Sequence, residues 1–385
     1  MRKICVITGT RAEYGIMSNL MRLIRDGEET KLQIIATNMH LSPEFGMTYK
    51  EIEADGFHLD KKVEMLLSSD TAVGTLKSMG LATIGIADAL NELRPDLVVI
   101  LGDRYEMLAA AECAMISKIP IAHLHGGEIT EGAYDDSIRH CITKLSHLHF
   151  TSTEEYRRRV IQLGEQPDKV FYVGALGIDN ILHDTPMSLH ELEDSLGFKL
   201  GKKFFLITFH PVTMESGTAA EQCRNLLNVL DDYRAEYKLL FTLPNSDTDG
   251  RIIISLIQDY VARNKECAMS ITSLGRKRYY SAFRYCSAVI GNSSSGLVEA
   301  PNFHIPTLNI GDRQKGRCKG TSIIDCKPSY ASIHEGLKQV TSESTLKRCK
   351  IAANPYYKEN TLSNIYDVIS SYPLEGLIQK SFYNL

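Results

Sequence analysis

Short apolar runs rich in β-branched residues alternate with helical patterns along most of the 385-residue chain. Such alternation is typical of right-handed βαβ units, and therefore of parallel sheets that are covered by helices on both faces. The runs that predict strands are Ile4–Thr8, Leu32–Ala36, Leu97–Leu101, Ile121–His125, Leu148–Thr151, Val170–Val173, Phe204–Thr208, Lys238–Thr242, Ala268–Thr272, Ala288–Ile290 and Thr307–Asn309.

The length of the chain exceeds what one ordinary hydrophobic core accommodates, so two domains are expected. We place the break at Val173–Gly177, which gives a Rossmann-like domain over residues 1–175 and a second one over 176–353. Residues 354–385 read as helices that pack back on the first domain. Ligands of doubly wound sheets bind outside the carboxyl ends of the strands. The predicted fold is therefore α/β, with two doubly wound domains that face one cleft.

Composition narrows the class of partner and the compartment. A net charge of −4 offers no basic surface for nucleic acid or an anionic membrane, and no apolar run reaches the roughly 18 residues of a membrane span. The chain enters its first strand at once, which argues against a signal peptide. Nine cysteines without a CxxC pair predict reduced thiols in the cytoplasm and argue against a zinc site.

The stretch Ile290–Glu299, IGNSSSGLVE, follows an apolar strand and precedes a helical pattern. A turn of this kind aims backbone N–H groups, serine hydroxyls and a helix N-terminus at one point, where a phosphate fits. Glu299 is placed to accept hydrogen bonds from a ribose diol. The alternative is a serine-rich loop that only caps a helix.

Charged residues follow the first and third predicted strands of the first half. Arg11 comes after the turn Thr8–Thr10, where it binds a phosphate or a base or else pairs with Glu13. Asp103 and Arg104 end the strand Leu97–Leu101, where the alternative is an aspartate N-cap beside a surface arginine.

The densest group of titratable residues lies between His123 and His140. His123 and His125 are expected on one face of a strand, and Glu128 follows them. In the next helical pattern Asp135 and Arg139 are four residues apart, as are Asp136 and His140, so each pair is adjacent. These side chains favour acid–base chemistry. An HxH metal site is the rival interpretation, but no third ligand is identifiable.

The second half adds His210, at the end of the strand Phe204–Thr208, and three cations within Asn309–Arg317. His210 is expected to face the acids of the first domain across the cleft. The cations suit a diphosphate, and the alternative is a basic surface loop.

Six motifs in this order resemble the hydrolysing UDP-N-acetylglucosamine 2-epimerases of sialic-acid biosynthesis, the NeuC type, over nearly the full length. They are GDRYE (Gly102–Glu106), HLHGGE (His123–Glu128), DDSIRH (Asp135–His140), TSTEEYRRRVIQLGE (Thr151–Glu165), GNSSSGLVE (Gly291–Glu299) and NIGDRQKGR (Asn309–Arg317).

The resemblance implies a GT-B-like fold with UDP held mainly by the second domain, no cofactor and no metal. It implies catalytic roles for Asp103, Glu128, Asp135 and His210. It further implies substrate or UDP contacts from Arg11, Arg104, His125, Arg139, Asn245, Leu274, Ser293, Ser294, Gly296, Glu299 and Arg313.

One position departs from the family pattern. Other branches carry a glutamate where this chain has His125, so the acid in that role is Glu128, Asp135 or His125 itself. The implied reaction eliminates UDP and rehydrates a glycal, giving N-acetylmannosamine. Two alternatives share the UDP cradle: a 2-epimerase of the 2,4-diacetamido-trideoxy UDP-sugar of the legionaminic-acid route, and a GT-B glycosyltransferase. We expect a homo-oligomer, either a dimer or a tetramer.

Overall fold

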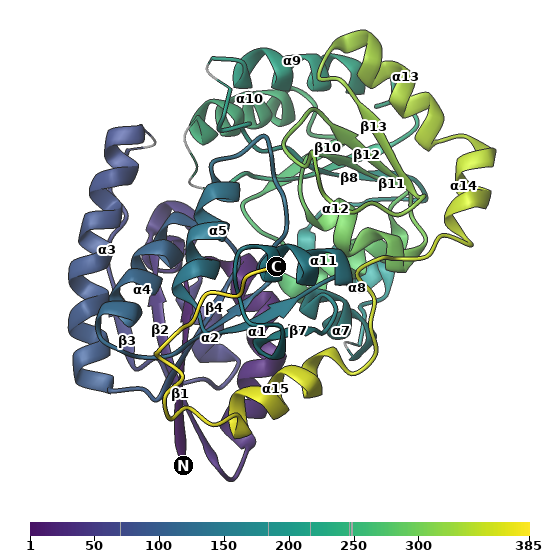
Figure 1. Ribbon diagram of the computed structural model, residues 1–385. Helices are drawn as coiled ribbons and strands as arrows, with labels where there is room; N and C mark the ends of the chain where they lie inside the picture. Colours follow the sequence, from purple (N-terminus) through teal and green to yellow (C-terminus); the bar gives the residue numbers. More distant parts are fainter. Residues whose placement is uncertain (70, 184, 216, 246, 248) are drawn as a thin grey trace. The chain divides into compact units, whose positions relative to one another are not determined.

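The computed structural model describes residues 1–69, 71–183, 185–215, 217–245, 247 and 249–385, and it divides into two compact units (Figure 1). The first unit comprises Met1–Glu128, Asp135–Asn180 and Tyr356–Leu385, and the second comprises Ile129–Tyr134 and Ile181–Pro355. Each unit is built on one parallel sheet, as the alternating pattern predicts.

The sheet of the first unit has the order β3-β2-β1-β4-β5-β6-β7, with all strands parallel. The strands are β1 (Arg2–Thr8), β2 (Thr30–Thr37), β3 (Lys61–Val63), β4 (Leu97–Leu101), β5 (Ile121–Leu124), β6 (Leu148–Thr151) and β7 (Val170–Tyr172). The helices are α1 (Arg11–Asp26), α2 (Tyr49–Ala54), α3 (Ala72–Leu93), α4 (Tyr105–Ile116), α5 (Asp135–Leu145), α6 (Glu154–Gln162), α7 (Leu176–His183), whose last residues belong to the second unit, and α15 (Thr361–Ser371).

Burial of both sheet faces explains why these strands are apolar without strict alternation. In β1, Ile4 and Val6 pack into a core shared with α1 and α15, whereas Cys5 and Ile7 pack against α3 and α4. Helices therefore cover the sheet on both sides.

The second unit repeats this plan with the strand order β10-β9-β8-β11-β12-β13, again all parallel. Its strands are β8 (Phe204–Thr208), β9 (Lys238–Thr242), β10 (Ala268–Ile271), β11 (Ala288–Gly291), β12 (Thr307–Ile310) and β13 (Ile323–Cys326). Its helices are α8 (Leu189–Leu196), α9 (Ala219–Leu230), α10 (Gly250–Arg263), α11 (Gly275–Tyr285), α12 (Ser295–Val298), α13 (Tyr330–Val340) and α14 (Glu343–Cys349).

Each strand that the sequence predicts is present, with ends that shift by at most two residues. The strands β3 and β13, short and at the edges of their sheets, were not predicted. One detail is wrong: β5 ends at Leu124, and His125 has a φ of +65°. His123 and His125 therefore do not share a strand face.

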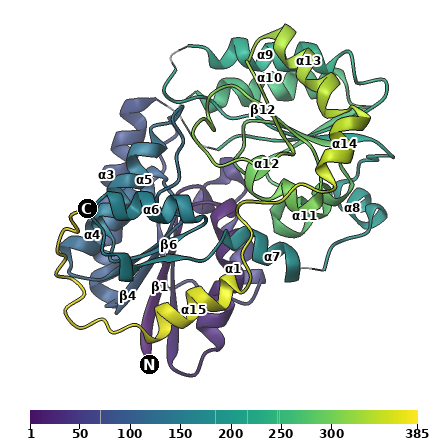
Figure 2. The ribbon, with the colours of Figure 1, turned by 45° about the vertical axis from the view of Figure 1, so that its right-hand side comes forward.

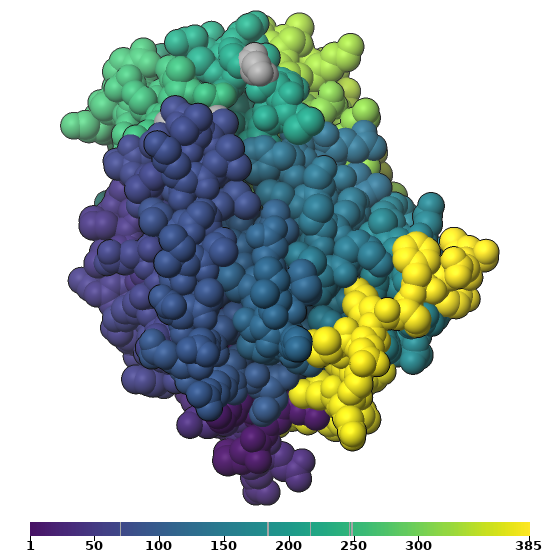
Figure 3. All heavy atoms as spheres, turned by 60° about the vertical axis from the view of Figure 1, so that its left-hand side comes forward, coloured from purple at the N-terminus to yellow at the C-terminus, as the bar shows by residue number. Residues whose placement is uncertain are grey.

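Two segments belong to a different unit from the residues next to them in the sequence. The C-terminal residues return to the first unit, where α15 packs on α1 (Figure 2) and Ile365 and Ile369 enter the core. The last residues then run over the surface of that unit (Figure 3), where the Lys380 ammonium pairs with Glu165 at 2.7 Å. The segment Ile129–Tyr134 belongs instead to the second unit.

All nine cysteines are free thiols. No helix within the described ranges is long and apolar enough to cross a membrane.

Candidate functional site

The strand order reverses between β1 and β4 in the first unit and between β8 and β11 in the second. Loops that leave the carboxyl ends of adjacent strands at such a switch point diverge and leave room for a ligand. The residues predicted from the sequence follow these strands and their neighbours β5 and β12, so each unit carries its own group of candidate residues.

Arg11 lies at the start of α1, directly after β1. Its guanidinium pairs with Glu51, with 2.6 Å between Nε and Oε2. Glu13, the partner that the sequence suggested, instead accepts hydrogen bonds from the N–H groups of Gly9 and Thr10 at 2.8 and 3.1 Å. Glu13 thus closes a capping box with Thr10, and this box fixes the loop that presents Arg11.

Two buried carboxyl groups lie behind this loop. Glu106 is fully buried and pairs with Arg104 at 2.8 Å, and a Cβ at Gly9 would lie only 2.3 Å from Glu106 Oε1. Burial, together with the charge of Glu106, raises the pKa of Glu13 to about 8. Arg104 caps α4 through its main chain, so the predicted aspartate N-cap does not form there.

The raised pKa of Glu13 predicts a pH dependence of stability. The native carboxyl keeps its proton where the unfolded one has lost it, so the free energy of unfolding falls as pH rises from about 4.5 to 8, by up to about 1.4 kcal/mol per unit. Glu13→Gln keeps the acceptor oxygen and removes the titration. Urea unfolding between pH 7 and 8 should give a more negative slope in the wild type than in the variant, because the titration of the unfolded histidines is common to both proteins and cancels in the comparison. Equal slopes would contradict the assignment.

Arg139 is the centre of the acid group in the first unit. Its side chain is 1% exposed and pairs with Asp103, while Nη1 donates to the carbonyl of Glu128 at 2.7 Å and lies 3.8 Å from Asp136. One planar guanidinium therefore fixes the loop after β4 and the loop after β5 relative to each other.

His125 and Glu128 form a second contact within this group. The N–H of Leu176 donates to His125 Nε2 at 3.3 Å, so the ring proton resides on Nδ1, which lies 3.1 Å from Glu128 Oε1. The hydroxyl of Ser152 also donates to Glu128 Oε1, at 2.7 Å. Glu128 is thus a buried carboxylate that is oriented by at least two donors.

His123 has a different environment. Its ring is fully buried, with Nε2 at 2.7 Å from the carbonyl of Gly102 and Nδ1 at 3.2 Å from Thr143 Oγ1. Burial lowers the pKa of His123 to about 3, so the ring is neutral and holds strands β4 and β5 together. In the described part of the chain, no group of three histidine, cysteine or acidic side chains is arranged to hold a metal ion.

Asp135 and Asp136 begin α5. Asp136 contacts His140, with 3.6 Å between Oδ2 and Nε2, as the helical spacing predicts. Burial lowers the pKa of His140 despite this carboxylate. Asp135 is half-buried at the first position of the helix. It directly follows the segment Ile129–Tyr134, which belongs to the second unit.

In the second unit, the GNSSSG loop follows β11. Gly291 has a φ of +132°, and a Cβ there would lie 1.9 Å from the carbonyl oxygen of Thr208 on β8, so no other residue fits. Gly296 packs on Thr307 of β12, where a Cβ would meet a methyl group at 2.8 Å. Helix α12 has only four residues, so the loop's donors must come mainly from its own N–H groups and serine hydroxyls.

The hydroxyls of this loop are linked to a buried tyrosine that the sequence analysis did not single out. Ser295 Oγ lies 3.0 Å from Ser293 Oγ and 2.5 Å from the hydroxyl of Tyr279. Burial raises the pKa of Tyr279 to about 12, so this hydroxyl keeps its proton at neutral pH. Tyr279 thereby helps to orient the serines. This role could not be predicted from the sequence, because Tyr279 lies within an ordinary helical pattern.

His210 is held by an asparagine to which the sequence analysis gave no role. Asn292 Oδ1 accepts from the N–H of His210 at 2.7 Å, and Asn292 Nδ2 donates to the carbonyl of His210 at 2.8 Å. Asn292 is fully buried, and its own carbonyl accepts from Gln314 at 2.9 Å and Arg313 at 3.2 Å. It therefore joins the loops after β8, β11 and β12.

The remaining predicted residues also lie in this unit. Glu299 caps the C-terminus of α12 and is 8% exposed, and Leu274 is buried at the N-terminus of α11. Asn245 is half-buried in the loop after β9, and Ser293 and Ser294 are half-buried in the GNSSSG loop. The structure thus gathers His210, the serine loop and Arg313 at one end of the second sheet. The cleft expected between the two sheets stays a prediction.

Known proteins with similar sequences belong to the family that the six motifs resemble. Residues 22–370 match the family described as UDP-N-acetylglucosamine 2-epimerase. The GDP/UDP-N,N'-diacetylbacillosamine 2-epimerase (hydrolyzing) of Campylobacter jejuni is 46% identical over 324 residues, 84% of each chain. The polysialic acid biosynthesis protein P7 of Escherichia coli is 37% identical over 386 residues, covering 100% of this chain and 98% of that protein.

A solved structure supports the fold. The UDP-GlcNAc 2-epimerase of Methanocaldococcus jannaschii, in complex with UDP-GlcNAc and UDP, superposes with a TM-score of 0.79 at 19% identity, covering 96% of this chain and 99% of that one. The sequence match and the shared two-sheet fold lead to one conclusion: this chain belongs to the UDP-N-acetylglucosamine 2-epimerase family.

Proposed function

We propose that the protein is a hydrolysing UDP-sugar 2-epimerase that converts UDP-N-acetylglucosamine to UDP and N-acetylmannosamine, for sialic-acid biosynthesis. The observation that carries the proposal is the acid group of the first unit, in which Arg139 holds Asp103 and Glu128 in one network. A protein that only binds a nucleotide sugar needs a cradle but has no need of carboxylates that are held in place by other side chains.

The first step of the proposed reaction is loss of UDP. Carbon 2 of the sugar is too weak an acid for a carboxylate to deprotonate directly, so cleavage of the bond from carbon 1 to the phosphate oxygen must run ahead. Donors aimed at a developing negative charge are often worth several kcal/mol. The serine loop, Arg313 and the N–H groups near Gly291 supply such donors, and Glu299 is assigned to the ribose.

The second step moves protons. A carboxylate removes the proton from carbon 2 as positive charge builds at carbon 1, and a glycal remains. Water then adds at carbon 1, and an acid delivers a proton to carbon 2 from the opposite face, which gives the manno configuration. We assign the two proton-transfer roles among Asp103, Glu128, Asp135 and His210. The contact with His125 supports Glu128 as the carboxylate that this chain uses in place of an acid at position 125.

A second substrate has a specific observation in its favour. The 46%-identical relative is named for a diacetylbacillosamine sugar, which carries a second acetamido group. The elimination and rehydration would be the same, because they involve only carbons 1 and 2. Side chains around carbons 4 and 6 of the sugar decide between the two substrates.

The test is an incubation with each UDP-sugar in turn, without any acceptor, followed by identification of the free sugar. The proposal predicts equal amounts of UDP and of a 2-epimerised free sugar from UDP-N-acetylglucosamine. Preferential turnover of the 2,4-diacetamido-trideoxy UDP-sugar would move the assignment to that substrate. Release of unepimerised sugar, or reaction only when an acceptor is added, would indicate a GT-B glycosyltransferase instead.

We also propose that the protein is a homo-oligomer, through the outer face of α3. Four large apolar side chains on this helix are 41–66% exposed: Val73, Leu76, Leu81 and Ile84. Lys77 lies five residues after the start of the helix and Asp88 five before its end. Antiparallel pairing of two copies therefore brings each lysine next to the partner's aspartate.

Light scattering tests this arrangement. The wild type is expected at twice the monomer mass of 43.1 kDa or more, and Leu76→Asp combined with Ile84→Asp should give the monomer. A monomeric wild type at micromolar concentration would contradict it.

A further inference from the structure

The segment Ile129–Tyr134, here named the crossover segment, connects two of the proposed catalytic acids. Glu128 precedes it and Asp135 follows it, and both belong to the first unit, whereas the segment itself belongs to the second. The residues before it are fixed in the first unit, since Arg139 and Arg159 donate to the carbonyls of Glu128 and Gly127, each at 2.7 Å, and Asp135 after it is the first residue of α5.

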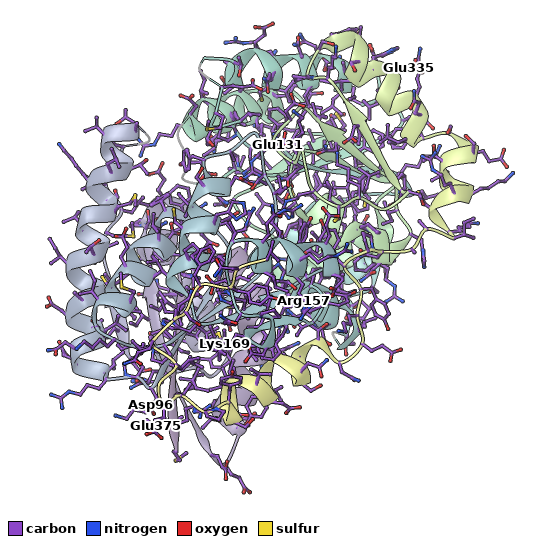
Figure 4. The ribbon with its side chains drawn as sticks, viewed as in Figure 1. Asp96, Glu131, Arg157, Lys169, Glu335 and Glu375 are labelled. Atoms are coloured by element: carbon purple, nitrogen blue, oxygen red, sulfur yellow. The ribbon has the colours of Figure 1, made fainter. Side chains whose placement is uncertain are left out.

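Within the second unit the crossover segment is bound to the loop that carries Arg313. The N–H of Glu131 donates to the carbonyl of Lys315 at 3.2 Å, and the carboxylate of Glu131 (labelled in Figure 4) lies 3.0 Å from the Lys315 ammonium. Gly316, with a φ of +85°, packs against Ile129 so closely that a Cβ there would lie 2.3 Å from a methyl carbon.

A second set of contacts binds the segment to the loop that carries His210. The N–H of Met214 donates to the carbonyl of Gly132, and the N–H of Tyr134 donates to Thr213 Oγ1, each at 3.2 Å. Thr130 and Ala133 are each only 3% exposed. Main-chain bonds on both sides and burial of its small residues make this segment a fixed part of the second unit.

Gly132 is the closest point of approach. A Cβ added there would lie 2.6 Å from the carbonyl oxygen of Asp312 and 2.8 Å from the Cα of Arg313. These are main-chain atoms, which cannot move aside as the end of a flexible side chain can. Any residue other than glycine must therefore displace the crossover segment from the Arg313 loop.

From these contacts we propose that the crossover segment is a positioning element that couples nucleotide binding at the Arg313 loop to the placement of Glu128 and Asp135. The coupling rests on the proposed function and adds to it the regulation of catalysis by nucleotide binding. A diphosphate bound by Arg313 restrains the 312–316 loop, and the main-chain bonds transmit that restraint to the residues that flank both acids. The acids are then in place for the reaction only when the nucleotide is bound.

The test variant is Gly132→Ala. We expect its turnover number to fall roughly 100-fold, the size of effect that a misplacement of about 1 Å produces, while its affinity for UDP, measured by calorimetry, changes little. Gly336→Ala is the matched control, because its Cβ would meet the side chain of Leu308 in the core of the same unit and not an atom of the Arg313 loop or the crossover segment. It should lower stability and leave turnover unchanged.

A second readout does not depend on activity. Adding UDP to the wild type should slow hydrogen exchange in peptides that cover residues 129–139, and Gly132→Ala should lose this protection while still binding UDP. If Gly132→Ala does not fold, Thr213→Val removes the acceptor of the Tyr134 N–H and should act in the same direction.

The outcomes separate the two proposals. Wild-type turnover in Gly132→Ala, or exchange that UDP leaves unchanged in the wild type, would overturn the coupling. A wild type that binds UDP with slowed exchange but has no epimerase activity would overturn the proposed function and retain the coupling.

Discussion

The variant Asn292→Ala is expected to lose most of its turnover and part of its stability. Asn292 satisfies both the N–H and the carbonyl of His210, and alanine leaves these buried groups without those partners. Each such loss costs about 1–3 kcal/mol, so the free energy of unfolding should fall by about 2–6 kcal/mol. The loop that carries His210 is then free to shift, and we expect the turnover number to fall roughly 100-fold.

Asn180→Ala is the matched control for this prediction. Asn180 is also fully buried, and its side chain donates to the carbonyls of Gly15 and Ile16 at 3.2 and 2.7 Å, but it lies on α7. It should cost similar stability, measured by urea unfolding, with turnover preserved. If Asn292→Ala retains wild-type turnover at saturating substrate, His210 does not need this support and its catalytic assignment fails.

The second large effect is expected for Arg139→Met. Methionine fills a similar volume but leaves Asp103 without its pairing guanidinium and the carbonyl of Glu128 without its donor. Breaking a buried pair typically costs about 3–5 kcal/mol, and the partial exposure of Asp103 places our expectation at about 3. We expect turnover to be lost at least 100-fold, because Asp103 and Glu128 then lose their common anchor.

Arg157→Met separates this effect from the general loss of an arginine. Arg157 donates to the carbonyls of Val170 and Pro167 at 2.9 and 3.1 Å on the same unit, and it is more exposed than Arg139. Its replacement should change stability modestly and leave turnover intact. Arg139→Lys restores charge without the planar fork, so it should recover stability more than turnover. Equal recovery of both would mean that Arg139 acts only through its charge.

The two sheets could be predicted from the sequence because buried parallel strands are short apolar runs between helices. The strands β3 and β13 lacked that signal, since an edge strand is covered on fewer sides and needs fewer apolar residues. The left-handed φ of His125 could not be predicted either, because Gly126-Gly127 marks the end of the strand only to within a residue or so and does not show which residue makes the turn.

Within the candidate site, charged residues at strand ends were identifiable from spacing, whereas their supporting partners were not. The partner of Arg11 is Glu51, which is 40 residues away in the sequence, on the helix α2 that follows the neighbouring strand β2. Asn292 and Tyr279 act through buried hydrogen bonds to residues distant in the sequence. The crossover segment had no sequence signal, because Gly132 in a loop reads as an ordinary turn.

In the proposed mechanism, UDP leaves by elimination and carbon 2 is reprotonated by a different group on the opposite face. The most direct test is to run the reaction in heavy water and examine the released sugar by NMR. Each N-acetylmannosamine, or the corresponding 2-epimerised sugar from the alternative substrate, should carry deuterium at carbon 2, with UDP released in equal amount. A manno product that retains the hydrogen of the substrate would contradict the account.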